Sequence, residues 1–303
     1  MKVAYLISAY QDEMQLKRLI EVLSCKENYF FIHIDKKINI DKFKNVLKSF
    51  ENVFFVENRV FVSWAGYSQV KAILSMIELM LSTKIEFDRV LSITGLDYPL
   101  VNNEKIINEF EKNPSKQYMI GFNISKCKTK KQWNKIQNYY FQDLHIKNRN
   151  ISSKITGILN RLVNILHIRK KMFTKEKDDF DIYMSSDYWA LTYECVKELY
   201  YEYLKNDKLK KYFKTSFAPS ELFMTTMVFN SKYAKDAELF DSNEYTCLAD
   251  LTKLHYIDYS NGIIVFDEND FDRLMDSKKM FARKFTTGKS DKLIEMINKE
   301  IKN

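Results

Sequence analysis

The sequence predicts an α/β fold with a mixed, mostly parallel central sheet that helices cover on both faces. Two observations predict it. Through the first hundred residues, short apolar runs alternate with segments of helical periodicity, which is typical of βα units joined by right-handed connections. The apolar runs are hydrophobic at nearly every position, as in parallel strands that are buried on both faces.

The elements of the first half are expected in strict alternation. The strands are expected at 3–8 (VAYLIS), 29–34 (YFFIHI), 53–56 and 89–93 (RVLSI). The helices between them are expected at 13–23, 41–50 and 69–81, the last with Ser68 as its N-cap. In such sheets ligands bind at the carboxyl ends of the strands, so the residues that follow each strand are the first candidates for a site.

Two of these strands run directly into an aspartate. Asp35 follows the second strand, and Asp97 follows the strand at 89–93 in the string Thr94-Gly95-Leu96-Asp97. Each could equally be a helix cap or a turn residue, because aspartate is favoured at both. Their shared placement at strand ends is more informative than either residue alone.

The second half is less regular. We expect strands at 118–124, 183–191 and 254–258, the last ending on Asp258, and a helix at 193–204. Within 215–231 a helix is apolar on nearly every side and is expected to be buried. One carboxylate, Glu221, lies in its first turn just after Pro219, where the helix dipole stabilises a negative charge. Without repeats or flexible linkers, we expect one domain over 1–303.

The composition is that of a globular protein, with 46% hydrophobic and 29% charged residues. The net charge of +8 fits an anionic partner such as a nucleotide, a nucleic acid or an acidic membrane, although the basic residues match no nucleic-acid-binding motif. The scattered cysteines argue against a zinc site or a disulfide framework. The N-terminus lacks the pattern of a signal peptide and no apolar run reaches the ~18 residues that span a bilayer, so we expect a cytoplasmic protein.

A basic insert is expected near 151–177. Over 151–171 the apolar residues recur at helical spacing among lysines and arginines. Such a helix either lies on an anionic membrane or packs on the domain with its lysines in solvent, and most amphipathic helices do the latter.

Seven segments, in order and spacing, resemble one family. They are YLISAYQDEMQLKRLI, FIHIDKK, VSWAGYSQVKAILSMIELML, LSITGLDYPL, YMSSDYWALT, APSELFMTTMVFNS and MFARKF. Together they resemble the core-2/I-branching β-1,6-N-acetylglucosaminyltransferases and the related peptide O-xylosyltransferases, over roughly Val3 to Phe285. The resemblance implies an inverting, nucleotide-sugar-dependent glycosyltransferase with a GT-A, Rossmann-type fold. The absence of an animal-type anchor and cysteine pattern suggests a bacterial member.

The resemblance divides the chain into a nucleotide-binding half, about 1–115, and an acceptor and catalytic half, about 116–290. In the first half it points to Asp35 near the uracil of a UDP-sugar, where a carboxylate can accept an imide N–H. The other nucleotide-side candidates are Ser8, Ala9, Trp64, Tyr67, Gly95 and Asp97. For the two aromatic residues, Trp64 and Tyr67, the alternative is packing in the core.

No metal cofactor is expected. Many GT-A enzymes hold a divalent metal with Asp-x-Asp at a strand end, but here Gly95 stands at the place of the first carboxylate, and one carboxylate alone is a poor magnesium site. The strings Asp179-Phe180-Asp181 and Asp270-Phe271-Asp272 are more typical of turns and caps. The resemblance implies a metal-independent reaction in which basic side chains stabilise the leaving diphosphate.

In the second half the resemblance assigns catalysis to Glu221, Lys284 and Arg283. Glu221 matches the catalytic base, which removes the proton of the acceptor hydroxyl. Lys284 matches the diphosphate-binding lysine, whose charge stabilises the leaving group electrostatically. Acceptor contacts are expected from Ser185, Ser186, Trp189 and Asp258. The family also carries a cation upstream of the diphosphate-binding lysine, and it is missing here at 260–264. Either Arg283 compensates for it or the leaving group is less stabilised.

The expected activity is transfer of a sugar, GlcNAc in preference to xylose or another hexose, from a UDP-sugar to a hydroxyl of a glycan or lipid-linked acceptor. The expected setting is bacterial surface polysaccharide synthesis in the cytoplasm, without nucleic acid. Peripheral contact to an anionic membrane through 151–177 is the alternative to packing of that helix on the domain. The alternative is a non-catalytic protein of the same fold that binds a sugar nucleotide or nucleic acid, which the missing cation favours.

Overall fold

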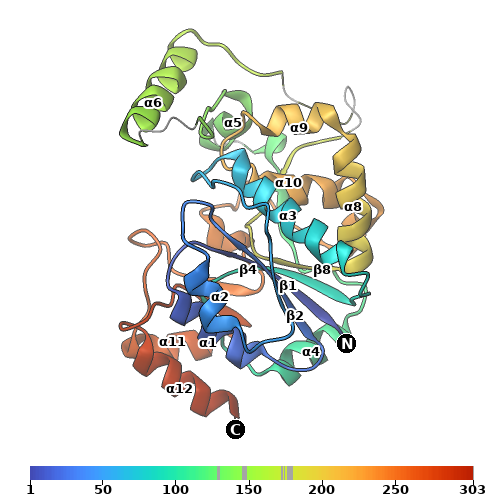
Figure 1. The fold of residues 1–303 in the computed structure, drawn as a ribbon. Helices are drawn as coiled ribbons and strands as arrows, with labels where there is room; N and C mark the ends of the chain where they lie inside the picture. Colours follow the sequence, from blue (N-terminus) through green and yellow to red (C-terminus); the bar gives the residue numbers. More distant parts are fainter. Residues whose placement is uncertain (128–129, 145–148, 172, 174, 176–179, 303) are drawn as a thin grey trace.

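The protein was analysed as a computed structural model, which describes residues 1–302 except 128–129, 145–148, 172, 174 and 176–179. Its central sheet has the strand order β3-β2-β1-β4-β8 (Figure 1). These strands are β1 (Val3–Ala9), β2 (Asn28–Ile34), β3 (Val53–Phe55), β4 (Arg89–Thr94) and β8 (Trp189–Thr192). The first four are parallel and β8 is antiparallel to β4. The predicted mixed, mostly parallel sheet is therefore confirmed.

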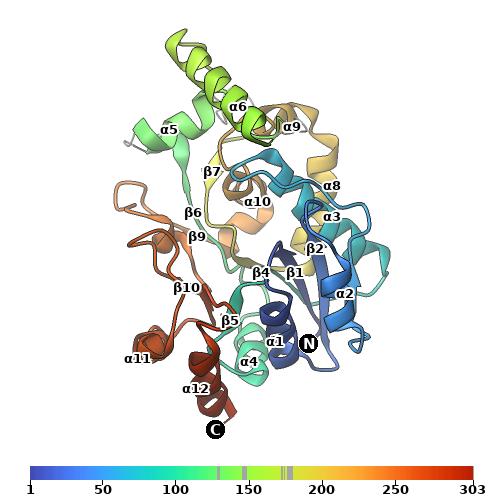
Figure 2. The ribbon, with the colours of Figure 1, turned by 60° about the vertical axis from the view of Figure 1, so that its left-hand side comes forward.

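Helices cover both faces of this sheet, as predicted (Figures 1 and 2). The side chains of β1 alternate between the two cores: Ala4 and Leu6 face one, Tyr5 and Ile7 the other. On the Leu6 face pack α3 (Tyr67–Ser82), α8 (Tyr193–Lys205) and α10 (Ser220–Phe229). On the Ile7 face pack α1 (Glu13–Leu23), α2 (Asp41–Leu47) and α4 (Asn103–Lys112).

Two smaller sheets extend the central one. One has the order β10-β11-β5 and contains β10 (His255–Ile257), β11 (Phe281–Arg283) and β5 (Asp97–Pro99). Its core is completed by α11 (Phe271–Asp276) and α12 (Asp291–Lys302). The other has the order β7-β6-β9 and contains β6 (Ile120–Asn123), β7 (Tyr183–Met184) and β9 (Glu238–Leu239). Three further helices are α5 (Lys130–Gln137), α6 (Arg149–Ile165) and α9 (Asp207–Phe213).

Some boundaries differ from the prediction. The strand expected over 183–191 is two strands in two sheets, β7 and β8. Ser185 and Ser186 lie between these strands, and their hydroxyls donate to backbone carbonyls of other segments. Ser68 is not the N-cap of α3: Gly66 holds that position, and Ser68 Oγ donates to Asp143 instead. The basic helix ends at Ile165, not at 171. Among the described residues, no helix is long and apolar enough to cross a membrane.

Candidate active site

Asp97 is the centre of a buried polar network at the carboxyl end of β4. Its carboxylate accepts hydrogen bonds from Thr94 N at 2.7 Å and Thr94 Oγ1 at 2.6 Å. Arg283 Nη1 lies 3.1 Å and His255 Nε2 3.2 Å from its oxygens. Burial opposes ionisation, but the bond to His255 and the charge of Arg283 outweigh it and hold the pKa of Asp97 below its usual range. The oxygens of this carboxylate are therefore already bonded to protein groups.

Arg283 is fixed by the pairing of β11 with β5, which places it in register with Asp97. The guanidinium donates to Asp97 and to Thr94 Oγ1 and is itself buried. Burial would lower the pKa of Arg283, but Tyr188 and Asp97 outweigh it and raise the pKa. The predicted role of Arg283 beside the leaving diphosphate stays a prediction, and the structure shows it engaged with Asp97.

Lys284 follows Arg283 at the end of β11. In the described part of the chain its ammonium group has no hydrogen-bond or ion-pair partner. Partial burial, and then the charge of Arg283, lower the pKa of Lys284. A cation without a carboxylate partner is available to an anionic ligand, which agrees with the expected position of a diphosphate.

Glu221 lies in the first turn of α10, one residue after the helix begins. Its Oε2 is 2.7 Å from Lys135 Nζ of α5, and each side chain has 14% of its surface exposed. Backbone bonds fix this turn: Glu221 N donates to Ala218 O, and Ser185 N donates to Glu221 O. The predicted base is thus held by an ion pair that the sequence did not reveal, because Lys135 is distant along the chain.

Asp187 is a second carboxylate of this site that sequence reasoning missed. It lies in the link between β7 and β8, and its Oδ1 is buried without a hydrogen-bond partner among the described residues. Burial, followed by the negative charge of Glu221, raises the pKa of Asp187 to about 7. The charges of Lys135 and Arg283 also act on it. Asp187 is therefore a buried carboxyl that feels the charges of Glu221, Lys135 and Arg283. Its only sequence signal is its place in SSDYWA, between the predicted acceptor residues.

The nucleotide-side candidates gather at the carboxyl ends of β1, β2 and β4. Asp35 N donates to Ala9 O, and Ser8 is paired with Thr94 of β4. Gly95 lies so close to β1 that a Cβ there would be 2.9 Å from the Ala9 Cβ, which accounts for the glycine. Asp35 Oδ1 accepts from Lys37 N at 3.0 Å and Val62 N at 3.3 Å. The structure therefore brings these predicted residues together.

Trp64 and Tyr67, predicted together, differ in environment. Trp64 is 77% exposed and meets Phe217 edge-on at 5.4 Å between ring centroids, so core packing is wrong for it. Its neighbour Ala65 accepts a hydrogen bond from Ala218 N, which places this loop against the start of α10. Tyr67 is buried and bonded to the hydroxyl of Tyr203, 2.9 Å away, so core packing describes it.

The predicted acceptor residues do not form a surface. Trp189 is 1% exposed within the core beneath β8, so its ring offers no face to a sugar. The Ser185 and Ser186 hydroxyls are buried and donate to backbone carbonyls of Ile120 and Leu251. Asp258 pairs with Arg273 at 2.8 Å. An acceptor contact through the ring of Trp189 is therefore not supported by its burial, and the two serines act as bridges between segments.

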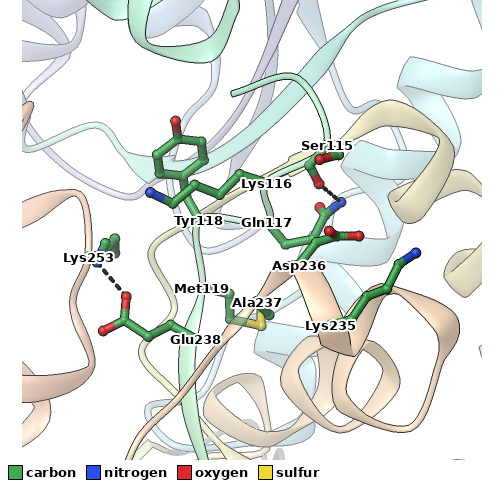
Figure 3. Close-up of a pocket in the computed structure, with 10 residues that line it drawn as sticks. All are labelled: Ser115, Lys116, Gln117, Tyr118, Met119, Lys235, Asp236, Ala237, Glu238 and Lys253. Carbon is green, nitrogen blue, oxygen red and sulfur yellow. Dashed lines mark hydrogen bonds and ion pairs between the residues drawn. The ribbon is translucent and has the colours of Figure 1, made fainter. Parts of the chain in front are cut away.

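A cavity of about 280 Å³ lies elsewhere, beside the beginnings of β6 and β9 (Figure 3). Gln117, Lys116 and Lys253 are among its lining residues, and none of the predicted site residues is. The candidate site is therefore defined by its charged groups and not by this cavity. Among the residues described, no group of three or more His, Cys, Asp or Glu lies close enough to hold a metal ion. Of the two Asp-x-Asp strings, Asp179 lies outside the described residues, and Asp270 pairs with Arg273.

Known proteins resemble this chain over most of its length. The sequence model of the Core-2/I-Branching enzyme family matches residues 3–262. The human N-acetyllactosaminide beta-1,6-N-acetylglucosaminyl-transferase is 23% identical over 93% of this chain and 68% of its own length. The human probable beta-1,3-galactosyl-O-glycosyl-glycoprotein beta-1,6-N-acetylglucosaminyltransferase 7 is 22% identical over 93% of this chain and 64% of its own. The chain thus spans about two thirds of these relatives.

Shorter and weaker resemblances were found as well. A xylosyltransferase of Ciona intestinalis is 29% identical over 35% of this chain and 13% of its own length. Among solved structures, mouse xyloside xylosyltransferase 1 has a TM-score of 0.34 and 13% identity, covering 79% of this chain and 84% of that one. A TM-score this far below 0.5 supports no conclusion about function.

Proposed function

Because the chain belongs to the Core-2/I-Branching enzyme family, we propose that it is an inverting glycosyltransferase that moves a sugar from a UDP-sugar to an acceptor hydroxyl without a metal. The observation that carries the proposal is the match of the family over residues 3–262. Glu221 lies in the first turn of α10, paired with Lys135, and Lys284 follows β11 without an ion-pair partner among the described residues. A carboxylate and a cation of this kind are the two charges that the proposed reaction needs.

Glu221 is proposed as the general base. Its carboxylate would accept the proton of the acceptor hydroxyl while that oxygen attacks the anomeric carbon, and Lys135 holds the carboxylate in position at 2.7 Å. Asp187, protonated below pH 7, would donate a hydrogen bond from a carboxyl group that has no protein partner at Oδ1. Its location beside Glu221 suits an acceptor hydroxyl or ring oxygen.

Lys284 is proposed to stabilise the departing diphosphate. Charge develops on the leaving oxygen as the glycosidic bond breaks, and a fixed ammonium group stabilises that charge without a change of its own. Arg283 is proposed to act on the site indirectly, by neutralising Asp97, because its guanidinium is bonded to that carboxylate. The missing upstream cation is not replaced by Arg273, which pairs with Asp258 and Asp270.

For the donor we propose UDP-GlcNAc before UDP-xylose, since two relatives that match 93% of this chain are named N-acetylglucosaminyltransferases. Asp35 and exposed Trp64 border the expected nucleotide position. For the acceptor and setting we propose a glycan or lipid-linked oligosaccharide in bacterial surface polysaccharide synthesis at the cytoplasmic side. Transfer from labelled donor to extracted lipid-linked oligosaccharides tests this setting.

The central experiment compares the wild type with Glu221→Gln. Labelled UDP-GlcNAc and UDP-xylose are supplied with acceptor glycans, in EDTA and then in manganese. We expect turnover in EDTA, loss of about 10²–10⁴-fold in the variant, as for removal of a general base, and unchanged UDP affinity. Glu194→Gln, an exposed glutamate in the first turn of α8, is the matched control. Activity that vanishes in EDTA and returns with manganese would contradict metal independence. UDP binding without any transfer would favour a non-catalytic role.

A further inference from the structure

α6 presents an apolar outer face. The face is formed by Lys154, Ile158, Arg161, Leu162 and Ile165. Each of them is three or four residues from another of the set, so all lie on one side of the helix. Both views place α6 at the end of the molecule opposite α12 (Figures 1 and 2). The aliphatic side chains of this face, with Leu166 and Ile168 that follow it, are between 47% and 65% exposed.

The contacts of α6 with the rest of the protein include polar ones. Asn160 Oδ1 accepts from Phe141 N at 3.0 Å, and Thr156 Oγ1 donates to Phe141 O at 3.3 Å. Thr156 is buried, whereas Ile158, two residues on, is exposed. An amphipathic helix normally buries its apolar side and leaves its polar side in water. In α6 a row of large aliphatic side chains faces outward, and contiguous apolar surface of this kind marks a contact site.

The charge around this face has one sign. Lys154 and Arg161 lie within it, and Arg169 and Lys171 follow it, all exposed. No aspartate or glutamate occurs between Asp143 and Glu176 in the sequence. Lys170 does not contribute, because it is buried and bonded to Tyr212 O and Ser216 Oγ. A partner that fits this face therefore has an anionic surface for the cations and an apolar layer beneath that surface for the aliphatic side chains.

We propose that the outer face of α6 docks on an anionic phospholipid bilayer, with its aliphatic side chains among the acyl chains and its cations at the phosphates. Aliphatic residues flanked by Lys and Arg have the pattern of helices that lie in a membrane interface. A second copy fits less well, because face-to-face docking would oppose cations to cations. Single-stranded nucleic acid is bound on aromatic platforms, and the face has none. The proposal rests on these side chains and not on the enzymatic activity.

The test is flotation of the full-length protein with vesicles. One set contains equal parts of phosphatidylglycerol and phosphatidylcholine, and the other contains phosphatidylcholine alone. We expect flotation with the anionic set only, weakened by added salt because screening reduces the attraction. The variant Ile158→Ser/Leu162→Ser/Ile165→Ser should stay in the unbound fraction. Its aliphatic control is Leu204→Ser/Leu239→Ser, exposed elsewhere, which should float like the wild type.

The charge variant is Lys154→Gln/Arg161→Gln. We expect its affinity for anionic vesicles to fall about thirtyfold, since two cations near an anionic surface are removed. Lys44→Gln/Lys48→Gln, at exposed positions in α2 and at its C-cap, makes the same change of charge elsewhere and should bind nearly as the wild type. Circular dichroism and thermal midpoints confirm that all variants are folded.

Three results would overturn the proposal. The first is no flotation of the wild type with anionic vesicles at low salt. The second is equal flotation of the wild type and the triple serine variant. The third is a dimer in gel filtration, or binding of single-stranded RNA, that the triple serine change abolishes while vesicle binding is absent. Flotation that is lost in both α6 variants and kept in both controls would support it.

Discussion

Replacing Asp97 by asparagine tests whether this carboxylate is a structural group or a ligand of the donor. The substitution keeps the shape of the side chain and removes the charge that Arg283 faces at 3.1 Å. The side chains are 0% and 10% exposed, so water cannot screen the remaining guanidinium. Breaking a buried pair by removing one partner costs about 3–5 kcal/mol.

That loss should be visible in two measurements. Urea unfolding at pH 7 should show a free energy of unfolding lower by about 3–5 kcal/mol, and calorimetry a Tm lower by about 5–8 °C for a chain of this length. The pKa of Asp97 is held below the ordinary value of 3.8 for an aspartate. The stabilisation is therefore present above that pH and is lost as pH falls through the folded pKa, where wild type and variant should converge.

The matched control is Asp258→Asn, which breaks the contact with Arg273, a residue 40% exposed, and should cost less than about 1 kcal/mol. Arg283→Met combined with Asp97→Asn should be less destabilising than the sum of the single changes, because no buried charge is left unpaired. A stability unchanged by Asp97→Asn, with UDP affinity lost, would refute the structural role and make Asp97 a donor ligand.

Three further changes probe other parts of the site and its supports. Lys284→Met should lower kcat by about 10²–10³-fold, as for the loss of one electrostatic donor, with the fold unchanged in circular dichroism; an unchanged kcat would remove Lys284 from the mechanism. Asp187→Asn should abolish a titration near pH 7 in kcat/KM, because the pKa of Asp187 is raised to about 7, and a profile that keeps this titration would assign it elsewhere. Burial lowers the pKa of Lys170 to about 7, so between pH 7 and 9 the unfolded chain binds one more proton and stability should rise by up to about 1.4 kcal/mol per pH unit. Lys170→Met should flatten that rise in urea unfolding, and an identical slope in both proteins would show that Lys170 keeps its proton.

The central sheet could be predicted because its information is local. The buried residues of β1 and β2 are apolar apart from Asn28 and His33, so period and length are enough to define the strands. The glutamate at the start of α10 was noticed in the same way, as a charged residue just before an apolar run, and the family resemblance then suggested its role as base. Both signals lie within a dozen residues of sequence.

The partners of the site residues could not be predicted, because they are set by contacts far along the chain. Ser186 bonds to Leu251 O and Glu221 to Lys135, so neither bond leaves a trace in local periodicity. Tryptophan is a residue type whose ring often packs against sugars. Only the pairing of Trp189 with Ser92 in the sheet reveals that this ring is buried. The same limit hid Asp187, whose environment is defined by residues of α5, α10 and β11.

The charge balance of the site explains why one lysine can serve a diphosphate. Asp97 is compensated by Arg283 and Glu221 by Lys135 in direct ion pairs. Below pH 7 the raised pKa of Asp187 keeps that carboxyl neutral, so among these groups the positive charge of Lys284 is left over for an incoming anion. Above pH 7 ionised Asp187 adds one negative charge to this set of groups. Donor affinity should therefore weaken as pH rises through 7, and Asp187→Asn, which cannot ionise, should keep the affinity of the acidic form.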